Sequence, residues 1–205
     1  MLTDNVLELT IETYTEIKVI PGQWALFLFE DKEWPFQRAY SVLDQDTDNE
    51  KTMLMFAIKL SETGRGGAVL RKTHIGDEVV IKWVFGHFVL QDTQLPKVFI
   101  WTGVGVIPLL NMAKYCTTEK QLFFSVSNKK DLFYEDRIKK IHGLGYEIHL
   151  SRESLPGYTP WRIDIVKYHF DPATEFYLCW KPETVQDIIE KLTLLGFKRV
   201  YFEKF

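Results

Sequence analysis

Apolar and polar positions follow two different patterns along the 205-residue chain, and the change falls near residue 95. Before it, short runs rich in β-branched, aromatic and aliphatic residues alternate with turn-forming residues, a pattern typical of strands. These strand-like runs lie at residues 6–13, 17–20, 24–29, 40–43, 53–60 and 79–84. Six short strands in a segment of this length predict a small antiparallel β barrel. We also expect one short helix at residues 67–73 and an exposed hairpin connection in the polar segment 44–51.

The second half of the chain alternates strand-like and helix-like segments. Near-continuous apolar runs, typical of parallel strands buried on both faces, lie at residues 98–101, 122–126, 146–150, 176–179 and 200–202. The clearest helix begins at Pro182 and ends before Gly196, because apolar residues recur at helical spacing between them. This pattern predicts a doubly wound α/β domain with a parallel sheet at residues 96–205, after the barrel domain at residues 1–95.

Composition argues against several classes of partner and site. The formal net charge is −3 and no dense basic run occurs, so neither nucleic acid nor an anionic membrane is expected as a partner. Cys116 and Cys179 are the only cysteines, too few for an iron–sulfur cluster, and the five histidines form no metal-ligand pattern, so no metal site is expected. The first residues carry no basic or long apolar leader, and no segment is long and apolar enough to span a bilayer. We therefore expect a cytoplasmic protein.

The candidate chemistry starts at the segment Arg38-Ala39-Tyr40-Ser41. An arginine offers two parallel hydrogen bonds to a phosphate, a tyrosine offers a flat face to an aromatic ring, and a serine offers a hydroxyl to a ring nitrogen. A flavin nucleotide needs these three groups. An ordinary strand with a surface arginine would explain the tetrapeptide better if it stood alone, so the motifs that follow it decide the interpretation.

Two glycine turns follow in order, Gly64-Arg65-Gly66-Gly67 and then Thr102-Gly103-Val104-Gly105 after a strand-like run. With them, the chain resembles the ferredoxin-NADP reductase superfamily, whose members pass electrons between a nicotinamide nucleotide and a bound flavin. The resemblance implies that Arg38 binds the pyrophosphate of FAD, that Tyr40 lies against the isoalloxazine ring, and that Ser41 bonds to the flavin nitrogen that accepts hydride.

The flavin side of the resemblance extends to a second strand and to the first glycine turn. Ile58 and Lys59 match the strand whose backbone runs beside the flavin ring, and the amides of Gly66 and Gly67 are implied to bind the flavin pyrophosphate. The family usually has serine or threonine at the position of Gly67, so we expect flavin binding to survive with weaker affinity. A flexible glycine loop without a ligand is the alternative for this turn.

The nicotinamide side of the resemblance rests on a longer turn that ends at Pro108. Thr102, Gly103, Gly105 and Pro108 are its implied cofactor-binding residues, because the segment resembles the family's Gly-Gly-Thr-Gly-Ile-Ala-Pro turn at the end of the first parallel strand. Thr102 stands in place of a glycine. A strand-to-helix turn without a ligand remains an alternative.

Nucleotide choice is implied by Ser151 and Arg152, which follow the third parallel strand. A serine hydroxyl and an arginine fork suit a 2′-phosphate, and relatives that use NADP have a similar Ser-Arg-Glu at this point. The resemblance therefore favours NADPH over NADH. The alternative is a charged surface loop.

The implied catalytic residues are Ser41, Cys179 and Glu203. In relatives, the cysteine lies close to the nicotinamide ring, and the glutamate of the C-terminal Glu-x-Phe motif can relay a proton to or from the serine or the reduced flavin. Trp180 departs from the family, which has a glycine there. Its side chain could obstruct the nicotinamide, stack on the nucleotide, or fill space.

The resemblance implies a flavoprotein reductase that passes electrons from NADPH or NADH through bound FAD to a separate acceptor. A ferredoxin, a flavodoxin, an oxygenase component or a small molecule could accept them. One alternative is a protein that holds flavin as an electron relay while its nicotinamide site is obstructed. Another is an interaction domain that binds no ligand.

Overall fold

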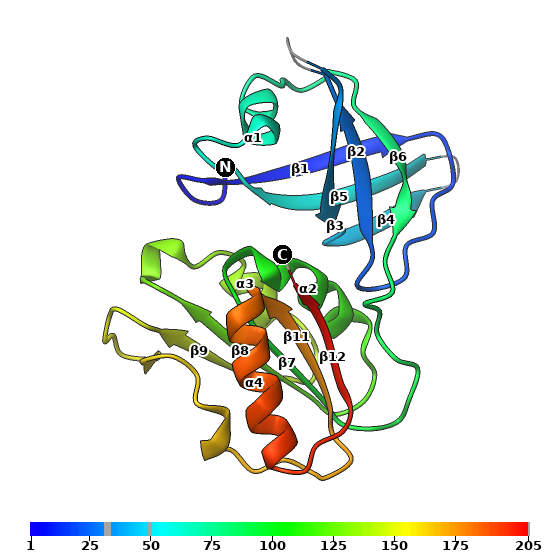
Figure 1. Cartoon of the computed structure of the whole chain (residues 1–205). Helices are drawn as coiled ribbons and strands as arrows, with labels where there is room; N and C mark the ends of the chain where they lie inside the picture. The colour runs from blue at the N-terminus through cyan, green and yellow to red at the C-terminus, as the bar shows by residue number, and fades with distance from the viewer. Residues whose placement is uncertain (31–33, 49–50, 205) are drawn as a thin grey trace. The chain divides into compact units, whose positions relative to one another are not determined.

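The computed structural model describes residues 1–30, 34–48 and 51–204. Two compact units make up the chain, Met1–Val89 and Leu90–Phe205 (Figure 1). Each unit has its own sheets and its own hydrophobic core.

Antiparallel strands in two three-stranded sheets form the first unit. One sheet has the order β1-β5-β4 and consists of β1 (Val6–Thr13), β5 (Lys51–Lys59) and β4 (Asp44–Asp48). The other has the order β3-β2-β6 and consists of β3 (Phe36–Ser41), β2 (Trp24–Phe29) and β6 (Val80–Phe85). The short helix α1 (Arg65–Leu70) follows β5 along the chain. Strands β1 and β2 occupy the residues that the hydrophobic pattern predicts.

Alternation along β2 builds the core of the first unit. Its residues Ala25, Phe27 and Phe29 are buried, whereas the residues between them are only partly buried. The ring of Phe27 meets the ring of Phe56 from the other sheet edge to face, with 5.0 Å between centroids. Burying each such side chain contributes roughly 1.5–3 kcal/mol, so the two sheets are held together by one shared apolar core.

One predicted strand of the first unit is absent from the structure. Residues 17–20 form no strand, because their N–H groups bond to side chains. The N–H of Ile17 donates to the Thr52 hydroxyl at 3.3 Å. The N–H of Val19 donates to the Gln45 side-chain oxygen at 2.7 Å. These amides are satisfied without a neighbouring strand, so the apolar pattern alone was insufficient.

Three further elements differ from the predicted bounds. The polar segment expected to be an exposed connection contains the strand β4, which pairs with β5, so that prediction was wrong over Asp44–Asp48. Strand β3 begins at Phe36 rather than residue 40, and α1 begins at Arg65 rather than residue 67. Each difference follows from polar or glycine residues that give no strong periodic pattern of their own.

A six-stranded parallel sheet forms the second unit, in the order β10-β9-β8-β7-β11-β12 (Figure 1). Its strands are β7 (Lys97–Thr102), β8 (Lys120–Val126), β9 (Leu144–Leu150), β10 (Thr159–Pro160), β11 (Glu175–Trp180) and β12 (Val200–Lys204). Five of them contain the predicted apolar runs, and the two-residue β10 was not predicted. Strands β8, β9 and β10 follow one another on one side of β7, whereas β11 and β12 lie on its other side, so the strand order reverses at β7. In such sheets, ligands bind outside the carboxyl ends of the strands near this reversal.

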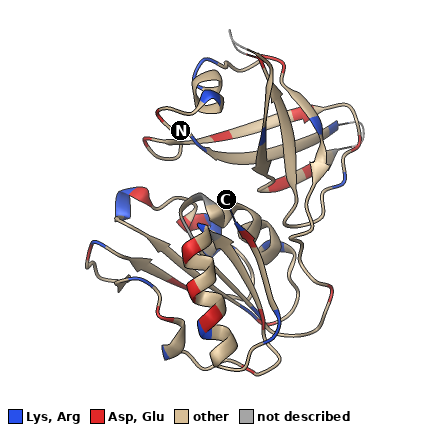
Figure 2. Ribbon diagram, in the orientation of Figure 1, with Lys and Arg blue, Asp and Glu red and all other residues tan. Residues whose placement is uncertain are grey.

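Helices connect the parallel strands. They are α2 (Val106–Tyr115), α3 (Glu135–Lys139) and α4 (Pro182–Leu194), with single 3₁₀ turns at Gly103–Gly105, Lys129–Asp131 and Ile165–Lys167. The predicted helix after Pro182 is confirmed as α4. It buries Val185, Ile188 and Leu192 in a core shared with the sheet. Its exposed residues include Glu183 and Asp187, and the Asp187 carboxylate lies 2.8 Å from the Lys191 ammonium. Figure 2 shows acidic and basic positions along the same helix.

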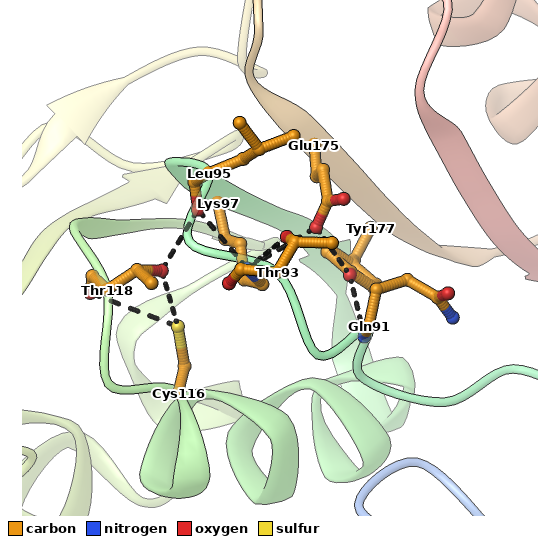
Figure 3. Close-up of polar contacts among 8 residues, drawn as sticks. All are labelled: Gln91, Thr93, Leu95, Lys97, Cys116, Thr118, Glu175 and Tyr177. Atoms are coloured by element: carbon orange, nitrogen blue, oxygen red, sulfur yellow. Dashed lines mark hydrogen bonds and ion pairs between the residues drawn. The ribbon is translucent and has the colours of Figure 1, made fainter.

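The segment before β7 is fixed to the second unit by buried polar contacts (Figure 3). The Lys97 ammonium donates to the carbonyl oxygen of Thr93 at 3.0 Å and lies 3.3 Å from the Glu175 carboxylate. The side chains of Lys97 and Glu175 are only 2% and 1% exposed. The Tyr177 hydroxyl donates to Glu175 at 3.1 Å and accepts the N–H of Gln91 at 3.0 Å.

The compact second unit begins at Leu90 and so includes these residues. Residues 91–96 contain no regular strand or helix, which is why they resemble a boundary in the sequence. Their polar groups nevertheless belong to the amino-terminal edge of the parallel sheet (Figure 3).

Candidate functional site

Three predicted flavin-binding residues of the first unit come together in space. Arg38 and Tyr40 project from β3, and Gly66 lies in the first turn of α1. A Cβ built on Gly66 would lie 2.8 Å from the Tyr40 hydroxyl oxygen and 3.3 Å from Cγ of Arg38. The absence of a side chain at this position therefore lets the helix approach the strand, and it joins two motifs that are far apart in the sequence.

The Tyr40 ring is held by the apolar core beneath it. It meets the Phe27 ring edge to face at 5.1 Å and the Phe29 ring at 6.3 Å. Burial raises the pKa of the Tyr40 hydroxyl, and the Arg38 guanidinium opposes that shift. The tyrosine is consequently a neutral, oriented aromatic side chain with a polar end beside the glycine turn.

A second arginine joins this group. The Arg65 guanidinium lies 4.2 Å from the centroid of the buried Phe36 ring, and the Arg38 guanidinium lies 5.0 Å from the same centroid. Both therefore make cation–π contacts with one ring. The prediction named Arg38 but missed Arg65, which the sequence shows only as one letter inside the glycine turn.

Gly67 has a structural reason to be glycine. A Cβ there would lie 2.9 Å from the carbonyl oxygen of Ser61 and 3.3 Å from its backbone nitrogen. The glycine at this position thus lets α1 pack closely against the loop that precedes it.

The remaining residues predicted to bind flavin differ in how exposed their side chains are to a ligand. Ser41 is the last residue of β3 and is partly buried, opposite Trp24 of β2. Ile58 is 2% exposed and belongs to the core, so it can contribute only backbone groups to a ligand. Lys59, the last residue of β5, is exposed.

In the second unit, the predicted nicotinamide turn lies at the carboxyl end of β7, where the strand order reverses. Gly103 has a φ of +56°, a conformation that glycine adopts without strain. A Cβ built on Gly105 would lie 2.5 Å from the carbonyl oxygen of Cys179. The start of α2 is therefore packed against the end of β11, and Pro108 is buried within that helix.

Two of the predicted catalytic residues are neighbours across β11 and β12. The parallel register pairs Cys179 with Glu203. Burial raises the pKa of the Cys179 thiol, and the nearby Glu203 adds to the shift, so Cys179 is a neutral thiol. Desolvation raises the pKa of the Glu203 carboxyl to about 7. Among the described residues, no hydrogen-bond partner reaches its buried Oε2 atom.

Ser151 and Arg152 lie at the same edge of the sheet, after β9. Their N–H groups donate to the carbonyl oxygens of Val126 and Ser127, both at 2.9 Å, so the chain stays beside the end of β8. Ser151 is partly buried and Arg152 is exposed. One strand separates them from the turn after β7.

Two predicted site residues have side chains outside the described part of the structure. The side chains of Thr102 and Trp180 are not among those described, although both residues lie in strands. Within residues 1–30, 34–48 and 51–204, no cluster of three or more acidic, histidine or cysteine side chains could hold a metal ion. In the same part of the chain, no helix has the length and hydropathy needed to cross a membrane.

No protein-family model matches the chain. A component of the Na⁺-translocating NADH-quinone reductase of Neisseria meningitidis is 25% identical over 191 residues, covering 79% of this chain and 47% of that protein. The electron transfer component of anthranilate 1,2-dioxygenase from Acinetobacter baylyi is 24% identical over 211 residues, covering 93% and 59%. The chain thus spans about half the length of the curated relatives it matches.

Solved structures match the whole architecture. The FAD/NAD-binding domain of a nitric oxide dioxygenase from Vibrio cholerae has a TM-score of 0.91 at 17% identity, covering 100% of this chain and 94% of that one. A ferredoxin NADP⁺ reductase from Neisseria gonorrhoeae, with bound FAD and NADP, has a TM-score of 0.81 at 21% identity, covering 98% and 93%. The predicted fold, a β barrel followed by a doubly wound α/β domain, is confirmed.

Proposed function

We propose that this chain, which has the fold of the ferredoxin-NADP reductase superfamily, is a flavin-dependent reductase that takes electrons from a nicotinamide nucleotide and passes them to a separate acceptor. The observation that carries the proposal is the meeting of Arg38, Tyr40 and Gly66 in the first unit. When bound there, FAD supplies a ring that accepts a hydride and releases electrons singly or in pairs.

The residues of the first unit fit such a group. The Arg38 guanidinium binds the pyrophosphate with charge-assisted hydrogen bonds, and Arg65 adds positive charge beside it. The Tyr40 ring, already fixed by two phenylalanines, supports the isoalloxazine, and the Ser41 hydroxyl bonds to its nitrogen. These groups are preorganised, which lowers the cost of ordering them on binding.

The second unit supplies the nucleotide site and a proton donor. The turn after β7 binds the nicotinamide nucleotide, and Ser151 with Arg152 selects NADPH over NADH through the 2′-phosphate. Glu203, whose pKa is raised to about 7, is able to hold or release a proton at neutral pH. Cys179, a neutral thiol because burial raises its pKa, would line the nicotinamide site without acting as a nucleophile.

The acceptor is proposed by class. One relative is a component of a quinone reductase, and another is the electron transfer component of a dioxygenase, so both act in electron transfer. A ferredoxin, a flavodoxin, an oxygenase component or a small molecule is the corresponding partner for this chain. A cytoplasmic location stays a prediction.

Calorimetric titration with FAD tests the central claim. Wild-type protein should take up FAD, and Arg38→Ala should weaken binding by about 1.5–3 kcal/mol if charge-assisted bonds to the pyrophosphate are lost. Lys82→Ala, which removes an exposed cation from β6 of the same unit, is the matched control and should bind like wild type. No uptake of FAD or FMN by the wild type would overturn the proposal.

A flavin-holding electron relay is the second candidate, and the replacement of the family's glycine by Trp180 is the observation that favours it. Anaerobic titration with NADPH separates the two. Bleaching of the bound flavin supports the reductase. A flavin that bleaches with dithionite but not with NADPH or NADH supports the relay.

A further inference from the structure

The outer face of the β3-β2-β6 sheet is apolar. Along β2, every second side chain lies in the core of the first unit, and the side chains between them point outward. The outward residues are Trp24, Leu26 and Leu28. An antiparallel sheet with one face in water normally carries polar residues at such positions, so the outward side of β2 departs from this pattern.

Strand β6 extends the apolar face on one side of β2. The register places Phe85 beside Trp24, and 5.2 Å separates the centroids of their rings. It also places Val80 beside Leu28. Between these pairs, Trp83 precedes a buried residue of the strand and therefore points outward. Val80, Trp83 and Phe85 are 56%, 60% and 38% exposed.

Strand β3 borders the face on the other side of β2. Gln37, Ala39 and Ser41 lie opposite the outward residues of β2, and none of them is charged. Arg38 and Tyr40 occupy the alternate positions of β3, opposite core residues of β2. The apolar surface therefore lies on the other side of β3 from these two predicted flavin-binding residues. This surface, the β2 face, consists of Trp24, Leu26, Leu28, Val80, Trp83 and Phe85.

Charge distinguishes the β2 face from the other sheet of the same unit. The exposed positions of β1 include Glu8 and Glu12, and Asp46 of β4 is exposed as well. Because the whole chain has a net charge of −3, two copies that meet through acidic surfaces repel each other. The residues of the β2 face are all uncharged, and Lys82 beside them has a long stem that lets its ammonium reach solvent. A second copy can therefore approach this face without repulsion between carboxylates.

We propose that the β2 face binds the same face of a second copy of this chain and forms a symmetric dimer. A two-fold interface uses one surface patch on both subunits, so the patch has to be complementary to itself. An uncharged apolar sheet face meets this condition, because two such faces pack about 10 Å apart and bury their outward side chains. The inference does not depend on the proposed function.

The size of the β2 face determines how strong this dimer is. Three short strands, about 4.8 Å apart, offer less than the roughly 800 Å² per partner that a standard stable interface buries. The dimer is therefore reversible, and we expect a Kd of roughly 10–500 µM.

Sedimentation velocity of the whole chain tests the proposal over a concentration range of about 5 µM to 1 mM. The wild type should pass from monomer to dimer across this range. Val80→Glu places a carboxylate on both of the meeting faces and should raise the dimer Kd at least about tenfold. Thr10→Glu is the matched control, because it places the same charge at an exposed position of β1, and it should dimerise like wild type.

Further variants separate loss of the interface from loss of the fold. Val80→Thr keeps the β-branched shape that suits a strand and should weaken the dimer by a smaller factor than Val80→Glu. Val80→Lys alone should also weaken the dimer. An equimolar mixture of Val80→Lys and Val80→Glu should associate more tightly than either variant by itself, because opposite charges then meet across the interface. A misfolded variant would not show this rescue.

Three results would count against the dimer. A wild type that sediments as a monomer at about 1 mM shows that the β2 face does not bind a second copy. A dimer that Thr10→Glu disrupts as strongly as Val80→Glu is held together by another surface. A monomeric wild type in which Val80→Glu slows electron transfer to a plant-type ferredoxin assigns the β2 face to an acceptor protein instead.

Discussion

At position 67, local packing opposes the serine or threonine that the resemblance would place there to contact a phosphate. Because a Cβ would lie 2.9 Å from the Ser61 carbonyl oxygen, Gly67→Ser should destabilise the protein by about 1–3 kcal/mol rather than tighten FAD binding. Chemical denaturation measures the first effect and calorimetry the second. Gly145→Ser is the control, since a Cβ there makes only ordinary contacts at 3.7 Å or more. Tighter FAD binding without loss of stability would contradict the packing argument.

Glu203 gives a residue-level prediction about pH. Its pKa of about 7 in the folded chain lies above the ordinary value of 4.5, so the folded chain binds more protons than the unfolded chain between those pH values. The free energy of unfolding should therefore fall as pH rises through this window. Glu203→Gln lacks the titrating carboxyl, so its free energy of unfolding should not show this fall. The stability of the variant relative to wild type should therefore increase as pH rises from 5 to 8.

Denaturation of both proteins at the two pH values checks this expectation. Glu62→Gln, at an exposed loop position, controls for the loss of one carboxylate and should keep the wild-type slope. Parallel pH profiles of wild type and Glu203→Gln would show that the carboxyl ionises in the folded chain without a desolvation cost.

Motifs in the sequence name candidate site residues, and the structure shows which of these residues lie together. Arg38 and Tyr40 stand in one tetrapeptide, and the structure brings Gly66 to them, as a shared flavin site requires. The roles of these residues stay predictions. Arg65 was not named from the sequence, because its contact with the Phe36 ring depends on the fold, which brings the two residues together.

At the scale of elements, strongly apolar segments were predicted best. Strand β2 and helix α4 have clear periodicity, and their cores confirm it. Strand β4 carries the sequence Asp-Gln-Asp-Thr-Asp, which has no apolar face, and it exists because β5 offers a neighbouring edge. Residues 17–20 show the converse, an apolar run whose amides bond to side chains. Tertiary hydrogen bonding decides both cases.

The amino-terminal edge of the parallel sheet depends on one buried ion pair. Lys97→Met should leave the Glu175 carboxylate buried without its cation and destabilise the protein by about 3–5 kcal/mol. Lys51→Met removes an exposed pair with Glu12 and should cost less than about 1 kcal/mol. Combining Lys97→Met with Glu175→Met should recover most of the stability, because no lone charge remains. Equal effects of the two lysine changes in denaturation would contradict this role.

At the scale of the whole molecule, the change of pattern along the chain was enough to predict two units of different architecture. The start of the second unit is harder to predict from the sequence, because residues 91–96 have no periodic apolar pattern. Polar contacts of Gln91 and Lys97 hold this segment instead. The hydrophobic pattern predicts which segments form helices and strands. Buried polar contacts between residues distant in sequence produce no periodic pattern, so the sequence does not reveal them.

At the scale of the whole molecule, the proposed reductase differs from the electron relay in whether a nicotinamide nucleotide can reduce the flavin, and the resemblance makes Trp180 the residue at which to test this. The family that the chain resembles has a glycine at the position of Trp180, so the resemblance predicts that a tryptophan there narrows the nicotinamide site. If the indole obstructs the nicotinamide, Trp180→Gly should speed flavin reduction by NADPH about tenfold or more, since about 1.4 kcal/mol of barrier is a factor of ten. Anaerobic stopped-flow bleaching measures this rate, with Trp83→Gly in β6 as the control for the same substitution outside the predicted nicotinamide site. A slower reduction would mean that Trp180 supports productive stacking, and an unchanged rate would make it a packing residue, which removes the main argument for an electron relay.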